Sequence, residues 1–154
     1  MPRSVGQIPL YYNKKAPQSH DYVEMSASPL YPFGYGLSYT SFDYSDLHLS
    51  ALTPRSFEVS FKVRNTGKYD GEEVAQLYLR DEYASVVQPL KQLKHFARFY
   101  LKRGEEREVK FILSEEDFSL VDRNLKSIVE PGTFQIMIGA ASDDIRLQTK
   151  VEIK

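Results

Sequence analysis

Hydrophobic and polar residues alternate along most of the chain from about residue 40 onward. The alternation is most regular at residues 145–153, where apolar and polar side chains take turns almost without exception. A period of two places apolar side chains on one face of a strand and polar ones on the other. The pattern predicts about seven strands, at residues 42–49, 57–63, 73–80, 93–101, 109–113, 133–138 and 145–153.

The breaks between these segments carry residues that favour turns, such as Asn65–Gly67, Arg103-Gly104 and Pro131-Gly132. Only residues 114–121 have a helical pattern, and Ser114 as a capping residue with Asp117 three positions later predicts one or two turns there. Seven short strands joined by turns are typical of an antiparallel β-sandwich of the immunoglobulin or fibronectin type III shape. The chain is therefore predicted to be all-β.

The first 39 residues have a different character. They contain five of the eight prolines and six of the eleven tyrosines, and no helical or strand period runs through them. Proline fixes φ and removes a hydrogen-bond donor, so this stretch is predicted to be irregular. Its aromatic content is too high for a flexible linker. We therefore expect an irregular arm at 1–39, packed against a neighbouring body, and a β-sandwich at 40–154.

Composition excludes several classes of function. The chain of 154 residues has 20 basic and 21 acidic side chains, a net charge of −1, and this balance argues against a nucleic-acid partner. The absence of cysteine excludes disulfides and thiolate metal sites. No apolar run approaches the roughly 18 residues of a membrane-spanning helix, and residues 1–20 contain no apolar stretch of the kind found in signal peptides.

The acidic residues do not predict a catalytic site. They cluster in four sets, at Glu72-Glu73, Glu105-Glu106, Glu115–Asp117 and Asp143-Asp144. Glycosidic hydrolysis needs two carboxylates that face each other across a cleft. Neighbouring residues of a strand point to opposite faces, so no set is expected to frame a substrate. All four sets are predicted to be solvated acids near turns or helix starts, and no catalytic residue is assigned.

Metal and cofactor sites are not predicted either. His20, His48 and His95 are isolated from one another and from acids at ligand spacing. The glycines of the FGYG sequence at 33–36 follow a proline rather than a strand and precede no helix, so they do not fit a phosphate-binding loop.

The aromatic corner is the strongest functional candidate. We predict that Tyr31, Pro32, Phe33, Gly34, Tyr35, Gly36 and Tyr39 form a rigid structural docking site for a neighbouring domain. Stacking of these rings on a sugar is the alternative, because tyrosine adds a hydroxyl group to an apolar ring.

The sequence resembles family 3 glycoside hydrolases, the β-glucosidase and β-xylosidase family. PLYPFGYGLSYTSF at 29–42 is similar to the segment that leads into the C-terminal domain of that family, and residues 4–15 are similar to the end of its α/β-sandwich domain. Residues 63–96, 101–113 and 129–147 resemble its fibronectin type III-like domain. The resemblance covers nearly the whole chain and keeps its order.

The resemblance implies that the catalytic residues lie elsewhere. In this family the nucleophilic Asp belongs to an N-terminal barrel and the acid/base Glu to the second domain, and no position here matches either motif. Ser45-Asp46-Leu47 resembles the Ser-Asp pair of the nucleophile but lies at the start of a predicted strand. The chain alone is expected to be inactive, with no cofactor.

The resemblance also implies the context of the chain. It would be a C-terminal accessory domain of a retaining, exo-acting, periplasmic or secreted enzyme that hydrolyses β-linked glucosides or oligosaccharides. Its partners would be the upstream catalytic domains of the same parent chain. A carbohydrate-binding module and a protein-interaction module are the alternatives.

Overall fold

The structure, a computed structural model, describes residues 2–7 and 26–154. Seven strands form its two main sheets: β1 (Phe42–Thr53), β2 (Ser56–Asn65), β3 (Gly71–Asp81), β4 (Gln92–Leu101), β5 (Glu106–Leu113), β8 (Gly132–Gly139) and β9 (Ile145–Ile153). A 3₁₀ turn, η1 (Glu115–Phe118), and the short strands β6 (Leu120–Val121) and β7 (Ser127–Ile128) lie between β5 and β8.

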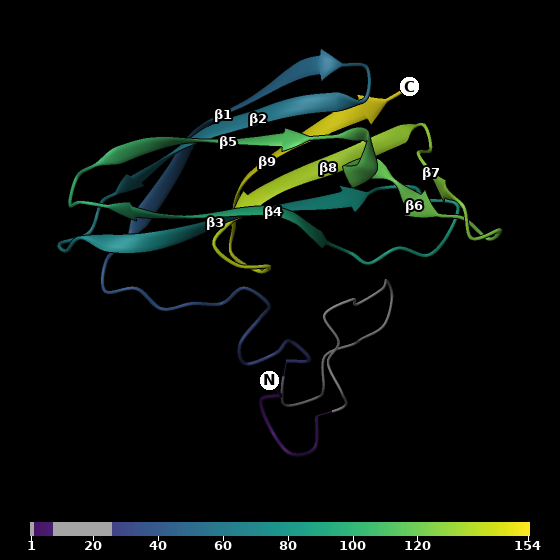
Figure 1. The fold of residues 1–154 in the computed structure, drawn as a ribbon. Coiled ribbons are helices and arrows are strands. Elements are labelled where there is room, and N and C mark those ends of the chain that lie inside the picture. The colour runs from purple at the N-terminus through teal and green to yellow at the C-terminus, as the bar shows by residue number, and fades with distance from the viewer. Residues whose placement is uncertain (1, 8–25) are drawn as a thin grey trace.

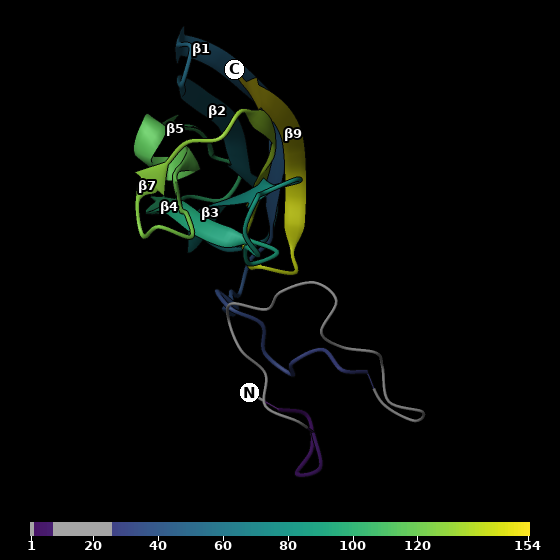
Figure 2. The ribbon, with the colours of Figure 1, turned by 90° about the vertical axis from the view of Figure 1, so that its right-hand side faces the viewer.

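The strands form two packed layers (Figures 1 and 2). One sheet has the order β1-β2-β5 and the other the order β4-β3-β8-β9, and all their pairings are antiparallel. The chain crosses between layers after β2, β4 and β5, and β1 contacts β9 along one side. The predicted all-β, fibronectin type III-like sandwich of about seven strands is confirmed.

The core lies between the two layers and follows the alternation of the sequence. Val59, Phe61 and Val63 of β2 face Leu77 of β3 and Ile136 of β8 within one cluster of buried side chains. Aromatic rings run through this cluster at centroid distances of 5.1–5.9 Å, from Tyr44 and Phe61 to Phe118 and Phe134. Buried apolar area of this kind is the main stabilising contribution to the fold.

The helix predicted at 114–121 is only a single 3₁₀ turn. The Asp117 carboxylate accepts a hydrogen bond from the backbone N–H of Ser114 at 2.8 Å, so the expected capping interaction is present. Phe118 then turns into the core, where it is 2% exposed, and Leu120 pairs with Ile128 in the β6–β7 hairpin. Burial of Phe118 and pairing of β6 end the helix early, since tertiary contacts override weak local propensity.

The end of the arm is tied to the sandwich through a buried side chain. Asn65 is fully buried, and its amide donates to the carbonyl oxygens of Tyr69 and Leu101 at 2.8 and 3.1 Å. The side-chain oxygen Oδ1 of Asn65 accepts from the Thr40 hydroxyl at 2.7 Å and from the Gly67 N–H at 3.1 Å. These four bonds use the whole hydrogen-bonding capacity of the amide and fix the chain just before β1.

Residues 26–41 contain no strand, and they lie below β3 and β4 in both views (Figures 1 and 2). Residue 1 and residues 8–25 of the predicted arm lie outside the described residues. Within the described ranges, no helix has the length and apolar character to cross a membrane.

Candidate functional site

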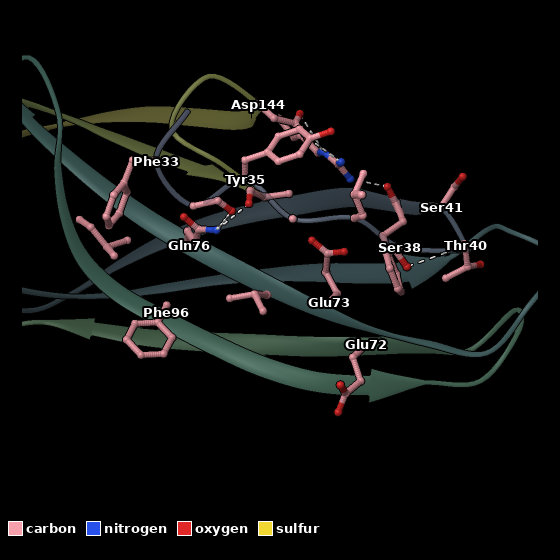
Figure 3. Close-up of a pocket in the computed structure, with 18 residues that line it drawn as sticks. Phe33, Tyr35, Ser38, Thr40, Ser41, Glu72, Glu73, Gln76, Phe96 and Asp144 are labelled. Atoms are coloured by element: carbon pink, nitrogen blue, oxygen red, sulfur yellow. Dashed lines mark hydrogen bonds and ion pairs between the residues drawn. The ribbon is translucent and has the colours of Figure 1, made fainter. Parts of the chain in front are cut away.

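A groove lies between residues 33–42 and the outer face of the four-stranded sheet (Figure 3). Its cavity volume is about 650 Å³. The arm, strands β3 and β4, and the turn between β8 and β9 all contribute to its walls. Its principal side chains are Phe33, Tyr35, Phe42, Glu72, Glu73, Val74, Gln76, Leu93, Phe96, Asp144 and Arg146.

A tight turn at residues 32–35 forms one wall of the groove. The Tyr35 N–H donates to the Pro32 carbonyl oxygen at 3.2 Å, and Gly34 has a φ of 78°. A positive φ at the third residue of such a turn strongly favours glycine. A Cβ at this position would also lie 2.1 Å from Oε1 of Gln76, so any other residue would displace the Gln76 side chain from its place.

Two hydrogen bonds hold this turn on the outer face of the sheet. Nε2 of Gln76, a side chain that is only 4% exposed, donates to the carbonyl oxygens of Gly34 at 3.1 Å and Ala140 at 2.6 Å. The side-chain oxygen Oε1 of Gln76 accepts a hydrogen bond from the Tyr78 hydroxyl. The Ser142 N–H donates to the Phe33 carbonyl oxygen at 2.9 Å. Part of the predicted docking corner therefore packs on its own sandwich.

The rest of the predicted docking corner is exposed. Tyr31, Phe33 and Tyr35 are about half exposed, and the rings of Tyr31 and Tyr35 pack at 5.1 Å. Tyr39 is 97% exposed and Leu37 is 89% exposed. The structure thus divides the corner into a turn fixed on the sheet and a following segment whose apolar side chains the described chain leaves uncovered.

A charged cluster closes the end of the groove near β1. The Tyr44 hydroxyl donates to Oε1 of Glu73 at 2.9 Å, and the Arg146 guanidinium lies 4.9 Å from the centre of the Tyr44 ring. Arg146 also donates to both oxygens of Asp144, at 3.1 and 2.8 Å, and to the Phe42 carbonyl oxygen at 2.5 Å. Arg146 thus ties β9 to the first residue of β1.

The two carboxylates of this cluster have opposite pKa shifts. Burial raises the pKa of Glu73, although the Tyr44 hydroxyl acts against it. Burial, followed by the nearby Glu73 charge, raises the pKa of Tyr44. Hydrogen bonds from Arg146 lower the pKa of Asp144. Burial therefore disfavours the charged form of Glu73, whereas Arg146 stabilises Asp144 as a carboxylate.

Sequence reasoning was wrong about Glu73. It is a buried residue of β3, 8% exposed, and not a solvated acid. Its neighbour Glu72 pairs with Arg98. The two side chains point in opposite directions in Figure 3, as expected, yet both line the groove, together with Asp144 of another acidic set. Only the pairing of β3 with β8, and of β8 with β9, brings these two sets together, and comparison of sequence neighbours could not find it.

This arrangement stabilises the end of the sandwich rather than presenting reactive groups. Both oxygens of Asp144 accept from Arg146, and Glu73 is buried with Tyr44 as its hydrogen-bond donor. Glycoside hydrolysis requires an acid and a carboxylate that both reach the sugar. The Ser45-Asp46 pair also serves a structural role, because Asp46 lies in a strand irregularity with a φ of 53° and pairs with Lys62 at 3.0 Å.

The histidines of the described chain lie away from the groove. His95 is not isolated as predicted, because its Nε2 lies 3.2 Å from Oδ2 of Asp117, and its ring stacks on Phe111. His20 lies outside the described residues. Residues 2–7 and 26–154 contain no cluster of three side chains that could hold a metal ion.

Known proteins with similar sequences extend over most of this chain. Residues 73–142 match the family model of the fibronectin type III-like domain. The chain is 44% identical to a β-xylosidase of Formosa agariphila and 42% identical to a periplasmic β-glucosidase of Salmonella typhimurium, in each case over 94% of its length and 21% of the relative. Over 81% of its length it is 46% identical to the β-glucosidase BoGH3A of Bacteroides ovatus, of which it covers 17%. The chain therefore spans about a fifth of the length of these curated relatives.

A solved structure agrees with these matches. The chain superposes on a β-glucosidase from Erythrobacter marinus with a TM-score of 0.90 and 40% identity, over 99% of this chain and 20% of that one. The chain belongs to the family 3 glycoside hydrolases, of which it carries the fibronectin type III-like domain.

Proposed function

We propose that this chain is the non-catalytic C-terminal accessory domain of a retaining, exo-acting β-glycosidase. The single observation that supports this most strongly is the length comparison, because β-glucosidases and β-xylosidases about five times as long contain a segment similar to nearly the whole chain. The parent enzyme would hydrolyse β-linked glucosides or oligosaccharides in domains that precede this one. The periplasmic relative supports a periplasmic or secreted location for the parent.

The accessory role would be mechanical. The turn at 32–35 is fixed on the outer face of the sheet by Gln76 and Ser142. The following residues, Leu37 and Tyr39, expose almost all of their side chains. Large exposed apolar side chains that are close in sequence are typical of interaction surfaces. We infer that Leu37 and Tyr39, at the exposed end of the docking corner, hold the sandwich against the upstream catalytic domains and leave the turn at 32–35 accessible.

A substitution in the parent enzyme tests this docking. Tyr39→Ser should lower the melting temperature of the full-length parent but leave that of the 154-residue chain unchanged, because Tyr39 makes little contact with its own sandwich. Tyr83→Ser is the matched control, since Tyr83 is also highly exposed, at 85%, but lies in the β3–β4 loop. Equal effects of Tyr39→Ser on the parent and the isolated chain would contradict docking.

The absence of catalysis is tested separately. The isolated chain, incubated with 4-nitrophenyl β-glucoside, should release no nitrophenol above the buffer rate. If it does, Glu73→Gln and Asp144→Asn should be compared with the unchanged chain. Turnover that either substitution abolishes would overturn the non-catalytic assignment.

A further inference from the structure

The groove presents aromatic rings from two distant parts of the sequence. Phe33 and Tyr35 come from the arm and Phe96 from β4, and their exposed fractions are 44%, 47% and 67%. Phe33 and Phe96 lie toward one end of the groove in Figure 3, and the hydroxyl residues Ser38, Thr40 and Ser41 lie toward the other. An apolar surface with polar groups at one end is typical of a small-molecule site.

The rings of the arm are held in place. The Phe33 carbonyl oxygen accepts a hydrogen bond from the Ser142 N–H, and the Gly34 carbonyl oxygen accepts one from the Gln76 side chain. The Tyr31 ring packs on Tyr35. Side chains that are already ordered lose little conformational freedom when a ligand binds, so such a surface favours binding.

The charges of the groove select the class of ligand. The one cationic side chain that lines it, Arg146, is paired with Asp144, and Glu72 is paired with Arg98. With its cation already paired, the groove disfavours ligands that carry phosphate or sulfate. Carboxylates accept hydrogen bonds, so they favour a neutral ligand with many hydroxyl donors. The volume of about 650 Å³ lies within the range of roughly 300–1,000 Å³ that is usual for ligand sites.

We propose that the groove binds a short neutral oligosaccharide. The apolar faces of its sugar rings lie against Phe33, Tyr35 and Phe96, and its hydroxyl groups donate to Glu72 and to the hydroxyl residues at the other end. The choice of a β-linked glucose oligomer as the ligand rests on the proposed function. The groove would give the parent a second contact with its substrate, outside the catalytic domains.

Nuclear magnetic resonance titration of the 154-residue chain with cellotetraose tests this proposal. We expect saturable shifts at the backbone amides of Gly34, Val74 and Phe96, with a Kd on the order of 1 mM. Phe96→Ala should weaken binding by at least about tenfold, because an aromatic side chain in direct contact contributes strongly to affinity. Phe96 is 67% exposed, so its removal leaves the fold intact.

Tyr100→Ala is the matched control. Tyr100 is an aromatic residue of the same strand, 52% exposed, and lies outside the groove. It should leave the affinity within about twofold of that of the unchanged chain. Absence of saturable shifts, or shifts that Phe96→Ala does not reduce, would overturn the proposal.

The α-linked maltotetraose separates the site from the proposed function. Weaker binding of maltotetraose than of cellotetraose supports both. Equal binding of the two sugars supports the groove as a sugar site but contradicts its link to a β-glycosidase. Binding of neither sugar overturns the site and leaves the docking role, which the Tyr39 substitution tests in the parent.

Discussion

The two faces of the four-stranded sheet are covered in different ways. The inner face carries Leu77 and Ile136, which are fully buried against the other sheet in a continuous apolar core. The outer face carries Gln76, whose side-chain amide donates a hydrogen bond to the Gly34 carbonyl oxygen of the turn at 32–35. Stability of the inner face depends on buried area, whereas attachment of the turn depends on the position of a few polar atoms and one glycine.

This difference has a functional consequence. A core that is stabilised by buried apolar area tolerates substitutions that conserve side-chain volume. A hydrogen-bonded contact that needs one particular geometry does not. The outer contact holds aromatic rings in a half-exposed state, which a core would not do. The inner face therefore supports the fold, and the outer face presents the surfaces that are available for docking and binding.

The largest effect is expected in the core. Leu77→Ala should lower the free energy of unfolding by about 3 kcal/mol, because it removes buried apolar atoms and leaves a cavity. Urea denaturation of the 154-residue chain measures this change. Leu52→Ala, at a position that is 53% exposed on β1, should change the free energy of unfolding by less than about 0.5 kcal/mol. Similar losses for both variants would show that the inner face is not the main source of stability.

A somewhat smaller effect is expected where the arm joins the core. Asn65→Ala should cost about 2 kcal/mol, since it leaves the Leu101 carbonyl oxygen and the Thr40 hydroxyl without the partner they have now. Thr66→Ala is the neighbouring control, because its hydroxyl makes only an exposed bond of 3.4 Å to Ser41. Urea denaturation should give a clearly larger loss for Asn65→Ala, and a reversed order would contradict the anchoring role.

The outer face is tested by two glycine substitutions. Gly34→Ala should weaken attachment of the turn by roughly 1–3 kcal/mol, because alanine resists a φ of 78° and its Cβ would meet Gln76. Hydrogen exchange at the Ser142 amide, which donates to Phe33, reports this loss directly. Gly36→Ala is the matched control, since no atom lies within 4 Å of its Cβ position. Unchanged Ser142 exchange in Gly34→Ala would show that the turn is attached by other contacts.

The smallest effect is a pH dependence at the charged end. Glu73 has a raised pKa in the folded chain, so folded molecules bind more protons than unfolded ones above the usual value near 4.5. Its contribution to stability is therefore complete below that pH and is lost as the pH rises through the folded pKa. Glu73→Gln should remove this decline, as measured by urea denaturation across the pH range.

Asp144 gives the opposite sign and serves as the comparison. Its pKa is lowered, so its contribution is present above the usual value near 3.8 and is lost as the pH falls through the folded pKa. Asp144→Asn should therefore reduce the loss of stability in acid. It should also make the Glu73 decline smaller without removing it, because burial is the main cause of the raised Glu73 pKa and the Asp144 charge adds to it. A decline that persists in Glu73→Gln would assign it to another group.

Alternation in the sequence predicted β2, β5, β8 and β9, and apolar residues on both faces predicted β3 and β4 as central strands. It did not predict the β6–β7 hairpin, which is only two residues long on each side and carries no period. The helical pattern at 114–121 predicted one or two turns, and the structure has a single 3₁₀ turn, since one buried side chain, Phe118, decides where that segment turns away. Local patterns are reliable where many residues agree and weak where a single tertiary contact dominates.

The candidate site was predicted in part. Its aromatic arm stands out in the sequence, as does the glycine between Phe33 and Tyr35. Phe96, Gln76 and the pair of Glu73 with Asp144 do not, because they come from β3, β4 and the β8–β9 turn. The surroundings of these residues depend on the order of strands in the sheet.

The sequence by itself determined the class of fold and the resemblance to a glycosidase family. These properties follow from periodicity and long matching segments, which are all local along the chain. Only the tertiary structure decided that the turn at 32–35 lies on its own sheet, that Glu73 is buried, and that rings from the arm and β4 share one groove. The reason is physical: strand pairing and layer packing bring together residues that are more than 60 positions apart, and no local pattern records which of them will meet.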